Sequence, residues 1–265
     1  MSARPPWRPL HALTGGSVGV LLAVAAWEMA ACALNPLILP PPRAVLAELM
    51  SLLADPANWT SIAATLQRTL LGFLAGAGVG LACGLAVGAS RALDKLIDPL
   101  TTLLMAMPPI AWVVLALIWF GIGNSAAVFT VVVAVVPIVA VAARAGLVAR
   151  DRALDQMAAL FGAGPLVRLL EVRLPQIVTH VAPAAITELA VAMKVAVMIE
   201  LLALADGLGA ALARARVNLD SATAFAWIAL VLALVLGLDR GLLRPLHARL
   251  ERWRAAGIPS PGGAA

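Results

Sequence analysis

The hydrophobic pattern divides the chain into six long apolar segments that short polar stretches separate. A helix needs about 20 mostly apolar residues to cross a bilayer. The segments that meet this length are residues 13–34, 69–90, 99–120, 126–143, 181–205 and 221–238. Between Asp98 and Arg144 no residue is charged, and the turn-forming sequence GIGNS at residues 121–125 divides that stretch in two. The pattern therefore predicts an all-α polytopic membrane protein with six transmembrane helices.

The composition supports the same class. Hydrophobic residues make up 62% of the 265 positions, charged residues make up 12%, and the mean hydropathy is +0.98. Soluble domains have about 45–50% apolar residues and about 25% charged residues. Two cysteines, Cys32 and Cys83, lie in apolar segments and make neither a disulfide scaffold nor a metal site. The apolar run after the basic N-terminus is too long for a secretory signal, so we interpret it as a retained anchor.

The distribution of positive charge predicts the orientation. If the N-terminus is cytoplasmic, fourteen Lys and Arg residues fall on the cytoplasmic side and four fall on the other side. The four are Arg43, Arg68, Arg214 and Arg216. Cytoplasmic loops carry the excess of Lys and Arg, so both termini are expected in the cytoplasm. The high pI of about 10.5 then reflects topology, and we expect a lipid bilayer and no nucleic acid as the partner of these charges.

A polar insert between the fourth and fifth segments, LDQMAALFGAGPLVRLLEVRLP at residues 154–175, cannot lie in hydrocarbon. Its first half places apolar residues at helical spacing on one face, which are Leu154, Met157, Ala158 and Phe161. Glycines at 162 and 164 break this helix, Pro165 starts a second one, and we expect Pro175 to stop it. Such a hairpin either lies on the membrane surface or docks into another protein.

The same insert resembles the cytoplasmic signature of the inner-membrane permeases of bacterial binding-protein-dependent ABC importers. The matching positions are Gln156, Met157, Ala158, Gly162, Val172, Leu174 and Pro175. The chain departs from the signature at Gln156, where the family has glutamate, and at Met157, where it has alanine. Three further stretches resemble the nitrate, sulfonate and taurine subgroup: LPPPRAVLAELMSLL from Leu39, MPPIAWVVLALIWFGIGNS from Met107 and DGLGAAL from Asp206.

The resemblance covers nearly the whole chain and implies a single transmembrane domain, residues 1–265, with the type I ABC importer permease fold in the bacterial inner membrane. It implies that the hairpin is the coupling helix, with Phe161 and the signature residues contacting an ATPase subunit. The expected partners are two ATPase subunits, a second copy of this chain and a periplasmic binding protein. The expected cargo is a small anion such as a sulfonate, taurine or nitrate, and related permeases carry bicarbonate, cyanate or vitamin precursors.

No nucleotide site is expected in this chain. A P-loop ends in Gly-Lys-Ser or Gly-Lys-Thr, whereas Lys95 and Lys194 follow Asp and Met. ATP and Mg are therefore assigned to the partner ATPase, and we expect no cofactor, metal or catalytic residue here. His11, His180 and His247 lie at or beyond the ends of the segments, which disfavours a membrane-embedded enzyme. A passive channel or an exporter stays open on composition alone.

Two groups of residues are candidates for the translocation pathway. Met107, Pro108 and Pro109 lie midway in the third segment, where paired prolines either kink the helix to shape a pathway or serve tight packing. Met193 and Lys194 lie within the fifth segment. A lysine at such a depth faces a cavity or a partner, so Lys194 contacts either the anion in transit or a carboxylate such as Glu28. Glu200 matches a family glutamate before the Gly-Leu-Gly turn, and we interpret it as part of the gate structure.

Overall fold

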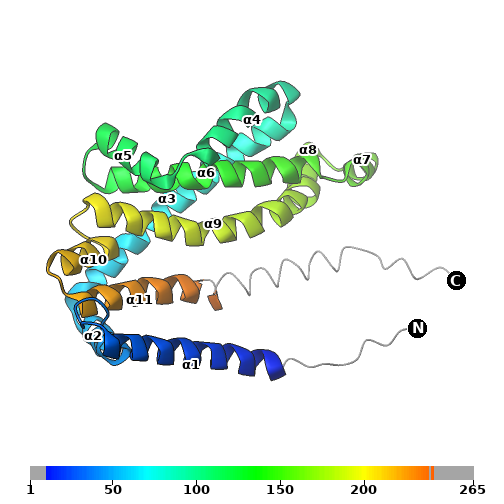
Figure 1. Cartoon of the computed structure of the whole chain (residues 1–265). Coiled ribbons are helices and arrows are strands. Elements are labelled where there is room, and N and C mark those ends of the chain that lie inside the picture. The colour runs from blue at the N-terminus through cyan, green and yellow to red at the C-terminus, as the bar shows by residue number, and fades with distance from the viewer. Residues whose placement is uncertain (1–9, 239, 242–265) are drawn as a thin grey trace. The chain divides into compact units, whose positions relative to one another are not determined.

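The computed structural model describes residues 10–238 with Arg240 and Gly241, and this part of the chain consists of helices joined by short turns and loops (Figure 1). No strand occurs in that part, and the prediction of an all-α fold is confirmed. The helices are α1 (Leu10–Ala33), α2 (Pro42–Ala54), α3 (Pro56–Ala89), α4 (Arg91–Ala106), α5 (Pro109–Phe120), α6 (Asn124–Val148), α7 (Arg152–Leu160), α8 (Pro165–Val167), η1 (Arg168–Arg173), α9 (Leu174–Ala203), α10 (Leu208–Val217) and α11 (Ser221–Leu238).

The contacts divide these helices into two compact units. The first unit holds the described residues up to Asn58 with residues 212–230, and the second holds residues 59–211 with the described residues from Val231. In the first unit, Trp27 donates its indole N–H to the carbonyl oxygen of Pro40 at 3.1 Å and lies against Phe225, with ring centroids 6.0 Å apart. Thr223 donates to Glu48 at 3.0 Å. These contacts join α1, α2 and the first half of α11.

Five of the six predicted segments fall on candidate membrane spans, and the first falls on α1. By length and composition, α3, α6 and α11 are each able to cross a membrane alone, and the stretch Val18–Ala33 of α1 is a shorter apolar helix. The sixth segment coincides with α11 at both ends. Two further candidates are bent pairs: α4 with α5, and Pro165–Ala203 with α10, which is bent by 42°.

The prediction of a continuous third span at residues 99–120 was wrong. α4 ends at Ala106, α5 begins at Pro109, and the two axes differ by 99°. Pro108 and Pro109 lack the N–H groups that a continuing helix needs. The residue before a proline is driven into extended backbone, and Met107 adopts φ −73° and ψ 130°. The paired prolines therefore break the helix, which is more than the kink expected from the sequence.

α3 begins thirteen residues before the predicted second span. It contains Arg68, which the charge count assigned to an extracytoplasmic loop, and this side chain is buried. Charge excluded Arg68 from the predicted span, but carboxylates from distant parts of the chain neutralise it, as described below. The other three arginines that the charge count assigned to the extracytoplasmic side, Arg43, Arg214 and Arg216, lie in the shorter helices α2 and α10.

Glycines at every fourth position of α3 allow it to contact α6 closely. A Cβ atom at Gly72, Gly76, Gly80 or Gly84 would lie 2.3–2.9 Å from atoms of α6 such as Val131 Cβ and the carbonyl oxygen of Ala140. Residues four apart share one helix face, so the glycines form a groove along α3. Small residues of this kind let helix backbones approach in membranes.

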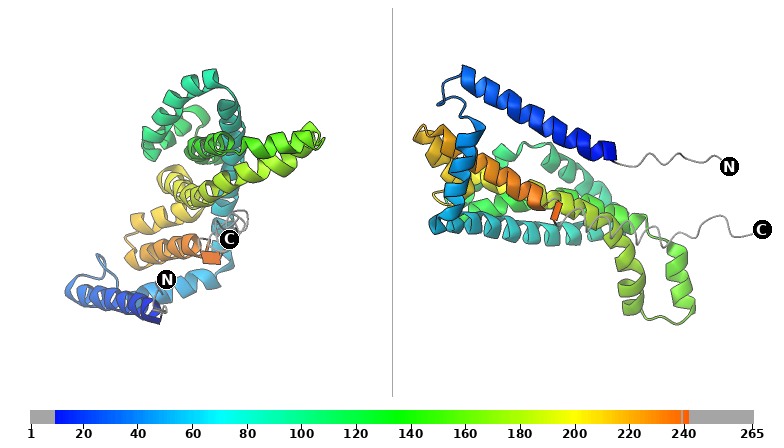
Figure 2. Two further views of the ribbon diagram at one scale, coloured as in Figure 1. Left: turned by 90° about the vertical axis from the view of Figure 1, so that its right-hand side faces the viewer. Right: turned by 90° about the horizontal axis from the view of Figure 1, so that it is seen from below.

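The core of the second unit lies between α6 and α9, which run side by side (Figures 1 and 2). Its centre consists of β-branched and small side chains: Val131, Val135, Val139, Ala192, Val195 and Ala196. All six have at most 5% of their surface exposed. This packing fixes α9 against α6, and α9 in turn positions the three features described next.

Candidate coupling hairpin and translocation pathway

The insert at residues 154–175 forms a hairpin that projects from the ends of α6 and α9 (Figure 2, in green). Asp151 caps α7 by accepting the backbone N–H of Ala153 at 2.8 Å. The chain then reverses at Gly162, whose φ of +78° lies in the left-handed region that favours glycine. Pro165 occupies the first turn of α8, as predicted.

An ion pair fixes the two arms of the hairpin to each other. Arg173 donates to both carboxylate oxygens of Asp155, at 3.1 Å from Nε and 2.8 Å from Nη2. These hydrogen bonds, followed by the charge of Arg173, lower the pKa of Asp155, so the carboxylate is ionised at neutral pH. At the base, Gln176 accepts the backbone N–H of Asp151 at 2.7 Å. The hairpin is therefore a defined structural element with its own internal bonds.

The prediction that Pro175 stops the second helix was wrong. The helical chain widens to a π-helix at Arg168–Arg173 and continues directly into α9, with Pro175 in its first turn. Pro175 lacks the N–H that a regular α-helix would use at this position, and the π-helix directly before it departs from regular α-helical hydrogen bonding. The second arm of the hairpin and α9 are one continuous helical segment.

Most of the predicted coupling residues are solvent-exposed in this chain. Met157 is 51% exposed, Phe161 is 84% exposed and its neighbour Leu160 is 88% exposed. Gln156, Gly162, Leu174 and Pro175 are exposed as well, whereas Ala158 is half-buried. Large apolar side chains gathered at a hairpin tip expose a patch typical of an interaction site.

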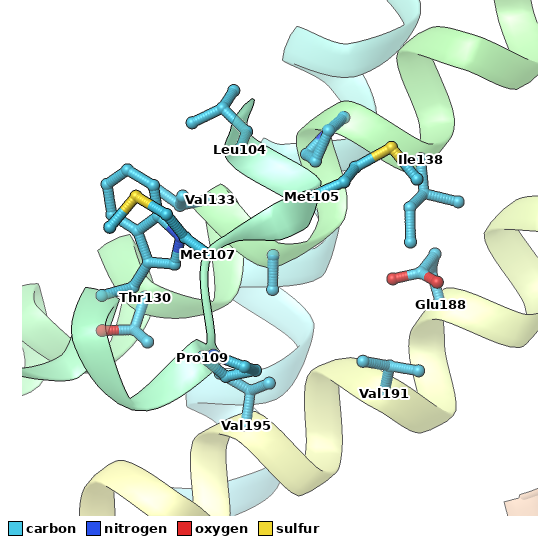
Figure 3. Close-up of a pocket in the computed structure, with 13 residues that line it drawn as sticks. Leu104, Met105, Met107, Pro109, Thr130, Val133, Ile138, Glu188, Val191 and Val195 are labelled. Carbon is cyan, nitrogen blue, oxygen red and sulfur yellow. The ribbon is translucent and has the colours of Figure 1, made fainter. Parts of the chain in front are cut away.

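A cavity of about 180 Å³ lies beside the break between α4 and α5 (Figure 3). Its walls are Leu104, Met105, Met107, Pro109 and Trp112 from α4, α5 and their junction, Thr130, Val133, Ala134, Pro137 and Ile138 from α6, and Glu188, Val191 and Val195 from α9. Met107 and Pro109 thus line a cavity, whereas Pro108 is exposed beside it. Apart from Glu188, none of these thirteen residues has an acidic or basic side chain.

The other candidates on α9 occupy different environments. Met193 is 1% exposed and belongs to the core. Lys194 is exposed on the helix surface and is not among the residues that line the cavity. Within the described residues of its own unit, no ion pair involves Lys194. The structure therefore does not bring Lys194 together with Met107 and Pro109.

Glu200 lies at the opposite end of α9 from the hairpin, inside a buried polar network. Its Oε1 accepts from Arg68 Nη1 at 2.8 Å, and its Oε2 accepts from Thr65 Oγ1 at 2.7 Å and from the backbone N–H of Gly209 at 3.1 Å. Arg68 also donates to Asp206 Oδ1 and to Asn124 Oδ1, each at 2.6 Å. This network joins α3, the start of α6, the end of α9 and the turn into α10.

The glycines of the Gly-Leu-Gly turn fit closely around this glutamate. Gly207 has φ +103°, and a Cβ there would lie 2.3 Å from Glu200 Cδ. A Cβ at Gly209 would lie 2.2 Å from the carbonyl oxygen of Val197. Glu200 is fully buried and has no part in the cavity lining, so its environment agrees with a structural role better than with ligand contact.

Sequence reasoning missed two groups of residues. The first group is Thr65, Arg68 and Asn124, which lie at least 76 positions before Glu200 in the sequence, a separation that no spacing pattern reveals. The second is Glu188, an acid within the fifth segment, whose position in a cavity follows from the break between α4 and α5. Among the described residues, no group of three or more His, Cys, Asp or Glu could hold a metal ion.

Comparison with known proteins agrees with these features. Residues 76–243 match the family described as binding-protein-dependent transport system inner membrane component. The taurine transport system permease protein TauC of Escherichia coli is 32% identical over 262 residues, which cover 95% of this chain and 94% of that protein. The putative aliphatic sulfonates transport permease protein SsuC of Escherichia coli is 34% identical over 154 residues, 57% of this chain and 59% of that protein.

Solved structures share the fold. The MetNI methionine ABC transporter in an inward-facing conformation has a TM-score of 0.62 at 19% identity, over 74% of this chain and 98% of that chain. An amino acid ABC transporter crystallised with histidines has a TM-score of 0.57 at 20% identity, over 77% and 94%. The family predicted from the hairpin signature is confirmed: this chain belongs to the inner-membrane components of binding-protein-dependent transport systems, the permease subunits of ABC importers.

Proposed function

We propose that this permease forms the pathway for a small sulfonate, of the taurine or aliphatic sulfonate type, which a periplasmic binding protein delivers. The match to the taurine permease over 95% of the chain carries this proposal, and the match to the aliphatic sulfonate permease supports the same substrate class. Reconstituted importer should accumulate a labelled sulfonate in an ATP-dependent manner. Accumulation of nitrate or bicarbonate in place of sulfonates would contradict the proposed substrate class.

The motor is proposed to act through the hairpin at residues 154–175. Its exposed apolar tip, with Leu160 and Phe161, suits a groove on an ATPase subunit. Two ATPase subunits would bind ATP and Mg and perform the hydrolysis, and a second copy of this chain would complete the pathway. Under this proposal both termini and the hairpin lie in the cytoplasm, as the distribution of Lys and Arg indicates.

Two glycines of one turn provide a matched test of docking. Gly162 needs its left-handed backbone, whereas Gly164 has φ −63° and open space around it. Gly162→Val should therefore distort the turn and release the ATPase or abolish substrate-stimulated hydrolysis, while Gly164→Ala retains both. The measurements are ATPase co-purification and uptake, with membrane insertion checked by expression level. Normal ATPase retention and uptake in Gly162→Val would contradict docking at this hairpin.

A further inference from the structure

A buried acid without a partner lies in the cavity beside the α4 and α5 break. Glu188 has 3% of its surface exposed, and its Oε2 accepts no hydrogen bond. Figure 3 shows its carboxylate in the space between α9 and Ile138 of α6. Burying a charged group is costly unless it is paired, and in membrane segments such groups mark substrate or ion pathways. The side chain therefore points to a ligand that supplies the missing donor.

The remaining walls of the cavity define what that ligand can be. No lysine, arginine or histidine contributes to the lining, and the hydroxyl of Thr130 already donates to the carbonyl oxygen of Ala126 at 2.8 Å. A simple anion such as nitrate would meet a carboxylate with no compensating cation. A ligand with a positive group would instead pair with Glu188.

The volume is compatible with a small organic ligand. The cavity measures about 180 Å³, whereas a single water needs only about 10–15 Å³ on the same measure. Apolar side chains such as Leu104 and Val191 suit a short hydrocarbon segment. The indole N–H of Trp112 is a donor that can serve a sulfonate oxygen.

We propose that this cavity binds a zwitterionic aminosulfonate during transport, with the Glu188 carboxylate accepting its ammonium group. The proposal rests on the proposed function and narrows it, because an aliphatic sulfonate without an amine would leave Glu188 unpaired. A site with a buried polar group rejects an analogue that lacks the matching group. Selection for the amine would thus occur in the permease in addition to the binding protein.

Direct binding tests this selection without the binding protein. The purified complex of permease and ATPase is titrated with taurine, ethanesulfonate and ethylammonium, and thermal stabilisation is measured. Taurine and ethylammonium should stabilise the wild type, and ethanesulfonate should do so weakly or not at all. Glu188→Gln should raise the taurine concentration for half-maximal stabilisation at least about tenfold, because a charge-assisted contact becomes a neutral one.

Two further variants control for folding and position. Glu188→Asp keeps the charge and should retain part of the response to taurine. Thr187→Val changes the neighbouring exposed residue, which lies outside the cavity lining, and should bind taurine like the wild type. Glu188→Gln replaces an unpaired buried acid by a neutral amide of similar size, so its unfolding temperature without ligand should equal or exceed that of the wild type.

The outcomes separate this proposal from the proposed function. Equal responses of wild type and Glu188→Gln to taurine would overturn the ammonium site, as would equal stabilisation of the wild type by taurine and ethanesulfonate. Sulfonate uptake by the reconstituted importer is measured independently. If sulfonates are not transported but ethylammonium still requires Glu188, the substrate proposal fails and the ammonium site stands. If sulfonates are transported but the Glu188 variants bind taurine like the wild type, the ammonium site fails and the substrate proposal stands.

Discussion

At the residue scale, one arginine accounts for much of the polar organisation at the end of α9. Arg68 contacts Glu200, Asp206 and Asn124, and it is 4% exposed. A guanidinium presents five donors in a fixed geometry, so a single side chain can connect three elements. Lysine, with one compact ammonium group, could not reach the same set.

Removal of this charge should be costly. Arg68→Met leaves the fully buried Glu200 without its counter-ion, and breaking a buried pair by removing one partner costs about 3–5 kcal/mol. The double variant with Glu200→Gln should recover most of the loss, since no uncompensated charge remains. Thermal unfolding of the purified variants measures both effects. A double variant whose loss equals the sum of the two single losses would show that the two residues act independently.

Lys194 has a different test because it lies exposed on α9. If it contacts the sulfonate group in transit, Lys194→Met should lower uptake while assembly and basal ATP hydrolysis persist, and Lys194→Arg should retain part of the uptake. Uptake and basal ATP hydrolysis are measured by transport and ATPase assays on the same preparations. A fall in thermal stability that Glu28→Gln restores would instead assign Lys194 to an ion pair.

At the element scale, the sequence predicts helices well where hydropathy alone decides them. Residues 221–238 were predicted and observed with the same ends, since no charge or proline interrupts them. The prediction of a continuous third span failed because hydropathy shows how apolar a segment is but not whether the helix axis changes direction within it. α3 was predicted too short because Arg68 ended the apolar run, and its partner Glu200 lies 132 positions away.

The glycine groove of α3, with a glycine at every fourth position, carries a prediction of its own. Gly84→Ala should destabilise the protein by about 1–3 kcal/mol, because the added Cβ would lie 2.3 Å from the carbonyl oxygen of Ala140. Gly78→Ala, on the same helix with open space around it, should be neutral or stabilising. Thermal unfolding compares the two. Equal stability of both variants would show that α3 and α6 can separate without cost.

At the scale of the whole molecule, the distribution of positive charges predicts a topology that can be measured directly. Cys32 and Cys83 are first replaced by alanine to remove background labelling, because both are free thiols. A cysteine at Ser125, in the first turn of α6, should then react with an impermeant reagent from outside the cell. A cysteine at Arg150, beside the hairpin, should react only after the membrane is opened. The reverse pattern would invert the proposed orientation.

The candidate site was predictable from the sequence only in part, and the reason is geometric. The hairpin is local, so its turn at Gly162 and its start at Pro165 could be inferred from neighbouring residues. The cavity requires α4, α5, α6 and α9 together, and Glu188 became a candidate only when those four elements were assembled. Features formed by neighbouring residues can be inferred from the sequence, whereas a site formed by several helices requires the tertiary structure.

The continuity between the hairpin and α9 has a mechanical consequence. α9 holds thirty residues, which at about 1.5 Å each make a rod about 45 Å long. If α9 moves as one rigid rod and does not bend at Pro183, which lies inside it, a tilt of about 10° at its base moves its far end by roughly 8 Å. A small push on Phe161 would therefore arrive, magnified, at the turn that encloses Glu200. In this picture α9 pivots at the π-helical segment Arg168–Arg173, and the stiffness of that segment determines how much of the hairpin's movement reaches the far end of α9.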